Sequence, residues 1–287
     1  MTGVAREIVA RVDHLPPMPA TAVRLSALLT DPEVDLKDVV EVIMYDPGFT
    51  TDLLRLANSA YFGFVRQIYS VQEAVVRLGL SRVFQLVVAS AVRSALVKEV
   101  PGYQLPAGEL WRHSVAVALA AEELALRLGA RGDSLLFTGA LLHDVGKIVL
   151  AEVSADRFAA VEELSQRERI PFEAAERRVL GTDHCEIGEV LVETWKLPPV
   201  MAPLLRWHHD PDGAPGPDRL IDLVHVADML CLMSGIGTGI DGLRYQPSRG
   251  ACSRLGLKVG DLEYVASRTI DRIADYDEMF TADQEDD

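Results

Sequence analysis

The histidines of this chain are spaced in a way that suits a metal-binding site. Six of the seven lie between residues 113 and 225, and they include two pairs of neighbours, His143-Asp144 and His208-His209. Neutral imidazole and carboxylate groups are the ligands of Zn, Fe and Mn sites in hydrolytic enzymes. A carboxylate beside a histidine can also bridge two ions while the imidazole holds one of them. The remaining members of the set are His113, His184 and His225, with Asp228 three residues after the last of them.

Each of these histidines also has an ordinary structural explanation. A lone helical histidine such as His225 is more often a hydrogen-bonded core or surface residue than a ligand. His208-His209 would suit a helix C-terminus, where the helix dipole favours a cation, and His143-Asp144 would suit a capped helix end. The spacing alone therefore leaves a metal site and a set of ordinary histidines equally open.

Other polar residues near the histidines are weaker candidates. Lys147 follows His143 by one helical turn and could reach a phosphate group, or could be a solvated lysine. Glu109 lies one turn before His113, would share its helix face, and is an additional candidate ligand. His14, before a proline-rich turn, is interpreted as a surface residue. The sequence contains no GxSxG motif, P-loop, dinucleotide fingerprint or placed Cys–His pair.

Composition narrows the class of protein. The net charge of −15 and the pI near 4.9 argue against general nucleic-acid binding, which depends on clustered Lys and Arg. The three cysteines are widely spaced without a CxxC pair, which predicts a reducing compartment. We find no signal-peptide pattern and no run of 18 apolar residues. We therefore expect a soluble cytoplasmic protein that does not associate with a membrane.

The elements that must position the histidines are predicted to be helices. Apolar residues recur at spacings of three and four nearly everywhere, and no segment alternates at period two, so the fold class is predicted to be all-α. Asp35 and Ser70 are predicted as helix caps. A segment rich in Pro and Gly at 101–108 suggests a boundary between an N-terminal helical subdomain, 1–105, and a second one, 106–280, before an acidic disordered tail, 281–287. Helices are expected at 22–29, 39–44, 49–57, 70–78, 81–97, 109–128, 135–142, 155–168, 172–180, 184–195, 199–208, 218–233 and 259–274.

Several segments carry a family resemblance. They are LPPMP at 15–19, DPGF at 46–49, LANSAYF at 56–62, SVQEAVVRLGL at 70–80, ALLHDVGK at 140–147, HCEIG at 184–188 and WKLP at 195–198. These segments are similar to the signature of the HDOD proteins, a branch of the HD superfamily, over roughly residues 12–235. The resemblance implies a helical HD-type bundle preceded by a helical N-terminal half. HDOD proteins are generally regarded as signalling output or scaffold modules without a demonstrated reaction.

The C-terminal half also resembles metal-dependent HD phosphohydrolases and their HD-GYP relatives, which degrade cyclic di-GMP. The resemblance implies a metal-ligand set of His113, His143, Asp144, His184, His208, His209 and Asp228, with Glu109 as an additional ligand in some relatives. It also implies a substrate-phosphate role for Lys147. HD-GYP proteins follow the paired histidines with a glutamate and later with Gly-Tyr-Pro. Here Asp210 follows them and no Gly-Tyr-Pro occurs, so cyclic di-GMP hydrolysis has no support in the sequence.

Three hypotheses follow for the function. The chain is a bacterial signalling module that binds a signalling protein or a small nucleotide, or a phosphohydrolase, or a structural relic of an enzyme. In the phosphohydrolase, Asp144 would bridge two ions that activate a water molecule, and Lys147 would stabilise the phosphoryl charge. His113, His143 and Asp228 would hold one ion, and His184, His208 and His209 the other. The cofactor is expected to be one or two divalent transition-metal ions, of Fe, Mn, Zn or Ni.

Overall fold

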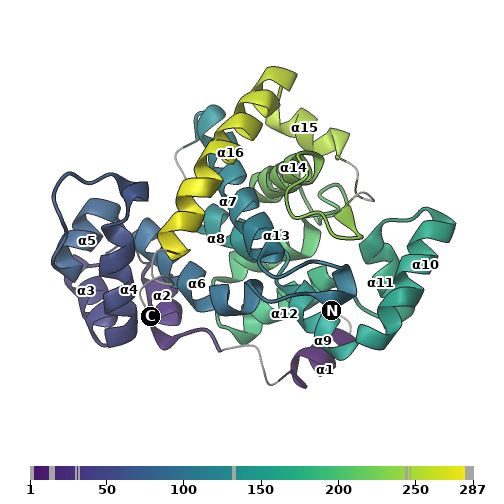
Figure 1. The fold of residues 1–287 in the computed structure, drawn as a ribbon, viewed down its shortest axis with the longest axis horizontal. Helices are drawn as coiled ribbons and strands as arrows, with labels where there is room; N and C mark the ends of the chain where they lie inside the picture. Colours follow the sequence, from purple (N-terminus) through teal and green to yellow (C-terminus); the bar gives the residue numbers. More distant parts are fainter. Residues whose placement is uncertain are drawn as a thin grey trace.

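The computed structural model describes residues 3–12, 17–29, 31, 33–130, 134–242, 245 and 247–281, and this part of the chain is all-α (Figure 1). It contains no strand, only an isolated bridge between Val100 and Leu105. The predicted fold class is thus confirmed. His14 and the predicted acidic tail beyond Thr281 lie outside the described residues.

In chain order the α-helices are α1 (Gly3–Val9), α2 (Ala20–Leu29), α3 (Leu36–Met44), α4 (Pro47–Ala57), α5 (Val71–Leu78), α6 (Leu80–Leu96), α7 (Glu109–Arg127), α8 (Ser134–Leu142), α9 (Gly146–Val153), α10 (Phe158–Glu168), α11 (Phe172–Leu180), α12 (His184–Thr194), α13 (Ala202–Trp207), α14 (Arg219–Met233), α15 (Arg249–Leu255) and α16 (Val259–Thr281). Short 3₁₀ turns lie at η1 (Ala60–Phe62), η2 (Pro101–Tyr103), η3 (Ala155–Arg157) and η4 (Pro199–Met201).

Several helices begin at a side chain that accepts a hydrogen bond from the first turn. Asp35 accepts from the Lys37 amide and Ser70 from the Glu73 amide, which confirms both predicted caps. Such caps satisfy amide groups that a helix start leaves without partners. Asp46, Asp183, Asp218 and Ser248 cap α4, α12, α14 and α15 in the same way.

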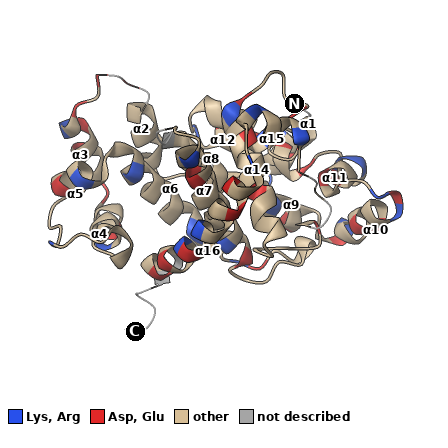
Figure 2. Cartoon of the chain, turned by 90° about the horizontal axis from the view of Figure 1, so that it is seen from above, with Lys and Arg blue, Asp and Glu red and all other residues tan. Residues whose placement is uncertain are grey.

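Helix α7 forms the centre of the fold. It packs against α8, α14 and α16, and its residues from Val115 to Ala121 are fully buried. The many alanines of this stretch allow neighbouring helices to approach closely. Helices α3, α4 and α5 gather on one side of the molecule, and α10 and α11 lie on the opposite side (Figure 1). On α10 and α11, acidic and basic residues are interspersed along the ribbon (Figure 2), and Arg178 pairs with Glu168 between the two helices.

The last helix in the described residues, α16, contacts both α7 and the N-terminal helices. Arg272 on α16 lies 2.7 Å from Glu123 of α7 and donates to the Tyr61 hydroxyl in η1 at 2.7 Å. Arg55 on α4 donates to the Met279 carbonyl at 3.1 Å. Residues near the C-terminal end of the described chain therefore hold the N-terminal helices against α7.

The structure differs from the predicted elements mainly in its short helices. Helices α1, α9 and α15 were not expected, because each is only about two turns long and shows no extended apolar periodicity. The Gly-rich segment 234–242 contains no α-helix, but Ile236 and Asp241 are buried in it. No single helix in the described residues is long and apolar enough to cross a membrane, although α5 and α6, bent by 111°, pass that test as a pair.

Candidate metal centre

Five histidines and two aspartates from different helices meet in one buried cluster. His113 comes from α7, the pair His143-Asp144 from the turn between α8 and α9, and His184 from the first residue of α12. The others follow α13 or belong to α14, and they are His208, His209 and Asp228. His143, His184 and His208 have no exposed surface. These are the seven residues that the sequence predicts as ligands, and the structure brings all of them together.

The two carboxylates lie between two groups of histidines. Asp144 Oδ2 lies 3.4 Å from His143 Nε2 and 3.7 Å from His113 Nε2. Its other oxygen, Oδ1, lies 3.6 Å from both His184 Nε2 and His208 Nε2. Each oxygen therefore faces a different pair of imidazoles, which is the arrangement required of a bridging carboxylate.

Asp228 lies between the same two groups. Its Oδ1 lies 3.1 Å from His113 Nε2, and its Oδ2 lies 3.4 Å from His209 Nδ1. His113, His143 and Asp228 form one compact set of potential ligands, and His184, His208 and His209 belong to another. A third potential set, His143, Asp144 and His208, overlaps both, so the division between two ions stays a prediction.

Hydrogen bonds behind the rings fix which nitrogen faces the cluster. The Nδ1 atoms of His113, His143 and His208 lie 2.7–3.0 Å from the backbone carbonyls of Ile236, Ala140 and Leu205. A carbonyl oxygen only accepts, so each Nδ1 carries the proton and the lone pair of the neutral ring lies on Nε2. His184 Nδ1 lies 2.8 Å from Glu176 Oε2, which has the same effect. Metal-binding histidines are oriented by outer partners of this kind.

The inward-facing atoms lack hydrogen-bond partners within the described chain. They are buried and include His143 Nε2, His208 Nε2, Asp144 Oδ1 and both carboxylate oxygens of Asp228. Buried polar atoms without partners are costly, and such atoms are explained when an ion contacts them. The donor set of imidazole nitrogens and carboxylate oxygens therefore fits a divalent transition metal.

The electrostatics of the cluster differ from ring to ring. Burial lowers the pKa of His208 to about 4, and burial with the neighbouring His208 and His184 lowers that of His209 well below its ordinary value. Burial would also lower the pKa of His113 and His184, but Asp228 and Asp144 outweigh it at His113, and Cys185 and Glu176 at His184, so both values are raised. Burial would raise the pKa of Asp144, but Lys147 and His143 outweigh it and hold that pKa well below the usual range. His208, His209 and Asp144 therefore have the protonation states that metal ligands require, whereas a metal ion would displace a proton from His113 and His184.

Lys147 is held by two carboxylates. Its Nζ lies 2.7 Å from Asp144 Oδ2 and 2.6 Å from Asp241 Oδ2, and 4% of the residue is exposed. Burial alone would lower the pKa of Lys147, but Asp144 and Asp241 raise it. The solvated-lysine explanation is therefore wrong. The ammonium group compensates the cluster's negative charge and faces two carboxylates rather than solvent.

The two remaining sequence candidates lie differently. Glu109 is partly exposed at the start of α7, and its carboxylate lies 4.0 Å from the Arg112 guanidinium on the same helix. His225 is buried, and both of its ring nitrogens have backbone partners, the His208 carbonyl at 2.7 Å and the Ser248 amide at 2.8 Å. His225 thus has the role of a hydrogen-bonded core histidine, as expected.

Residues that support the cluster were not predicted from the sequence. Glu176 joins His184 to the Tyr103 hydroxyl, which donates to its other oxygen at 2.6 Å. Asp241 belongs to the Gly-rich segment, which packs against α7. Gly237 has φ +64°, and a Cβ there would lie 2.3 Å from His113 Cβ. No local motif marks these contacts, because they form only when distant helices pack.

Gly146 permits the close packing that brings the His143-Asp144 turn to α12. A Cβ at this position would lie 2.0 Å from the His184 carbonyl oxygen and 3.0 Å from the Gly188 amide nitrogen. Any side chain would therefore push α9 away from α12. The absence of a side chain at Gly146 places Asp144 beside His184.

Comparisons with known proteins agree with this architecture. The family model described as the HDOD domain matches residues 15–211. A crystal structure of an HDOD domain protein of unknown function from Geobacter sulfurreducens is 28% identical, with 97% of each chain covered and a TM-score of 0.76. A candidate phosphohydrolase from Shewanella amazonensis SB2B is 25% identical, with 96% of this chain and 98% of that chain covered and a TM-score of 0.69.

A curated relative is longer than this chain. It is an uncharacterised protein of Treponema pallidum (strain Nichols), 29% identical over 233 residues that make up 79% of this chain. The match spans 44% of that relative's length. The family model covers well over half of the present sequence, and the fold agrees over nearly all of it. The chain therefore belongs to the HDOD family.

Proposed function

We propose that this chain is a regulatory HDOD protein that binds a divalent transition metal at its histidine–aspartate cluster and relays a signal by binding a partner protein or a small nucleotide. The observation that carries the proposal is the set of buried, partnerless ligand atoms on Asp144, His143, His208 and Asp228. The Nδ1 atoms of these rings are hydrogen-bonded and their Nε2 atoms face the cluster without partners, which suits an ion such as Fe, Mn, Zn or Ni.

Two features support regulation rather than turnover. The cluster residues are almost completely buried, with 2% of His113 and 1% of Asp144 exposed, so a phosphoester has no direct approach in this conformation. Lys147, which would have to meet a substrate phosphate, is engaged by Asp144 and Asp241. An ion held in this environment stabilises the packing of the surrounding helices.

The N-terminal helices offer a surface for a partner protein. Met44 and Tyr45 at the end of α3 are 63% and 74% exposed, and with Leu36 and Gln72 they line a cavity of about 500 Å³ between α3 and α5. We place the contact with a partner protein at this hollow, because its exposed apolar side chains could be covered there. This surface lies away from the cluster, as a relay requires.

A metal-dependent phosphohydrolase is the second candidate. It is supported by the position of Asp144, whose two oxygens face the two ligand sets, and by the similarity to the candidate phosphohydrolase of Shewanella amazonensis. Two ions bridged by one carboxylate are typical of phosphoester hydrolysis. This candidate requires the cluster to open to solvent.

The two candidates can be separated in one set of measurements on the full chain without a histidine tag. Elemental analysis of wild type and Asp144→Ala tests the ion, and phosphate release from a panel of nucleotides tests hydrolysis. We expect one or two ions per chain, reduced in the variant, with no phosphate release that depends on Asp144. Turnover lost in Asp144→Ala would favour the phosphohydrolase, and wild type without a transition metal, even after addition of Zn²⁺, Mn²⁺ and Fe²⁺, would refute both candidates.

A further inference from the structure

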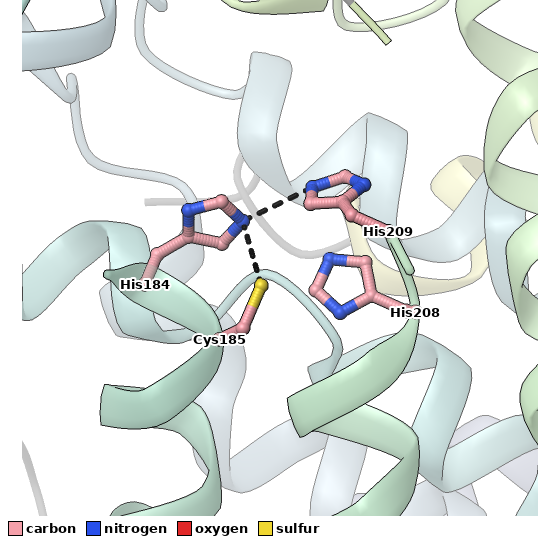
Figure 3. Close-up of side chains that lie close together, drawn as sticks. All are labelled: His184, Cys185, His208 and His209. Atoms are coloured by element: carbon pink, nitrogen blue, oxygen red, sulfur yellow. Dashed lines mark hydrogen bonds between the residues drawn. The ribbon is translucent and has the colours of Figure 1, made fainter. Parts of the chain in front are cut away.

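A cysteine lies within the cluster beside the predicted ligands. Cys185 follows His184 at the start of α12, and 2% of it is exposed. Its Sγ lies 3.5 Å from His184 Nε2. His209 Nε2 approaches the same nitrogen from another direction, at 3.1 Å (Figure 3). A thiol and a second imidazole thus converge on the metal-facing nitrogen of His184.

These separations are close to those that one tetrahedral ion imposes on its ligands. Zn–S bonds of about 2.3 Å and Zn–N bonds of about 2.0–2.1 Å, at the tetrahedral angle, place S and N about 3.5 Å apart and two nitrogens about 3.4 Å apart. The corresponding distances here are 3.5 Å between Cys185 and His184 and 3.1 Å between His184 and His209. The ligand atoms of His184, Cys185, His208 and His209 all lie within 4.8 Å of one another. Small side-chain rotations would bring all four to one ion.

The imidazoles of this set are oriented from behind. Glu176 holds His184 Nδ1, the Leu205 carbonyl holds His208 Nδ1, and the Tyr245 ring stacks on His209 with centroids 3.8 Å apart. His208 Nε2 is fully buried and has no hydrogen-bond partner in the described chain. An ion at the centre of the set would contact this nitrogen and the sulfur together.

We propose that Cys185 is a metal ligand and that His184, Cys185, His208 and His209 form a Cys–His₃ site for a thiophilic divalent ion such as Zn²⁺. The inference rests on the proposed function only for the premise that the cluster binds a metal. As the sulfur–metal bond forms, the thiol proton is released to solvent.

The sulfur ligand has two consequences. Thiolate favours Zn²⁺ over Mn²⁺ and Mg²⁺, which prefer oxygen ligands. With Asp144 Oδ1 also facing this set at 3.6 Å from His184 Nε2 and His208 Nε2, protein ligands would surround the ion, as in structural zinc sites. The other set, His113, His143 and Asp228, contains only nitrogen and oxygen ligands and would accept a harder ion.

Cobalt(II) is the probe that reports a sulfur ligand directly. The full chain is freed of metal, loaded with Co²⁺, and its absorption recorded for wild type, Cys185→Ser, Cys231→Ser and Cys252→Ser. We expect a thiolate-to-cobalt charge-transfer band in wild type that is absent from Cys185→Ser. The other two cysteines lie outside the set, so their variants should retain the band. The preference for Zn²⁺ over Mn²⁺ in competition should fall in Cys185→Ser by about tenfold or more, the lower limit for losing even an outer partner.

Each outcome of these measurements supports or refutes Cys185 as a metal ligand. Wild type that binds Co²⁺ without a charge-transfer band would refute the sulfur ligand and leave the proposed metal-binding function intact. A band that persists in Cys185→Ser would refute it as well. Wild type that binds neither Co²⁺ nor Zn²⁺ would refute the proposed function together with this inference. If Cys185→Ser does not fold, X-ray absorption of the zinc-loaded wild type decides, with a Zn–S distance of about 2.3 Å supporting the proposal and its absence refuting it.

Discussion

Replacement of Lys147 by methionine tests whether its ammonium group is structural. In the metal-free protein this change leaves Asp144 and Asp241, at 1% and 2% exposure, without their cation. Removal of one partner from a buried ion pair costs about 3–5 kcal/mol. At roughly 2–4 °C per kcal/mol for a large domain, the melting temperature should fall by about 10 °C. Thermal and urea unfolding of chelator-treated protein measure both quantities.

The pH dependence of the same variant has a defined sign. In wild type, Lys147 is the largest of the groups that hold the pKa of Asp144 well below its usual range against the effect of burial, so removal of Lys147 raises that pKa. Asp144 then takes up a proton more readily as the pH falls, so Lys147→Met should be less destabilised at pH 5 than at pH 8. The double variant Lys147→Met/Asp241→Asn should recover part of the loss, because one uncompensated charge is removed. Lys98→Met, at an exposed position, is the matched control. A loss below about 1 kcal/mol, the value of a surface pair, would refute the buried ion pair.

Three further predictions concern the helices around the cluster. Gly146→Ala should destabilise the protein by about 1–3 kcal/mol in urea unfolding and weaken metal binding, because the added Cβ meets the His184 carbonyl at 2.0 Å. Glu173→Gln should stabilise the protein at pH 8 by up to about 3 kcal/mol, since burial raises the pKa of Glu173 from 4.5 to about 7. A raised carboxyl pKa favours the folded state only at low pH, so this gain should vanish near pH 4.5. Glu176→Gln should reduce metal affinity by about 10–100-fold in a chelator competition, because His184 loses its charged outer partner.

The first two of these predictions have matched controls. Gly216→Ala adds a methyl group where no atom lies within 4 Å and should be nearly neutral, so equal losses at Gly216 and Gly146 would contradict the packing argument. Glu152→Gln removes an exposed carboxylate and should show no comparable dependence on pH. If the difference in stability between Glu173→Gln and wild type were the same at pH 4.5 and pH 8, the raised pKa of Glu173 would be contradicted. Unaltered metal affinity in Glu176→Gln would show that His184 does not need its partner.

The sequence predicts most of the helices because their signals are local. The range 172–180 matches α11, and the caps Asp35 and Ser70 are visible as polar residues before apolar repeats. The short helices α9 and α15 lack such a repeat and form by packing on neighbours. Helix α16 extends beyond the predicted end at residue 274 to Thr281, where Tyr276 and Phe280 pack against Trp111.

The residues that meet in the cluster were predictable from the sequence, but the residues that support them were not. The pairs His143-Asp144 and His208-His209 have recognisable types and spacing. Asp241 has no such signal, because it reaches Lys147 from a Gly-rich segment through tertiary packing. Cys185 is visible beside His184 in the sequence, but only the fold shows that its sulfur is directed at the ring nitrogen of its neighbour.

Helix α7 carries both His113 and Glu123, which gives the cluster a mechanical connection to the N-terminal helices. Their separation of ten positions corresponds to about 15 Å of continuous helix. The His113 ring at one end is held by the Ile236 carbonyl, and Glu123 at the other end pairs with Arg272, which also donates to Tyr61. A shift of His113 on ion binding or release must therefore move Glu123 as well, or strain the Arg272 contacts. Helix α7 therefore supplies a predicted ligand near one end and, through Glu123 and Arg272, contacts the N-terminal half that carries the proposed partner-binding surface.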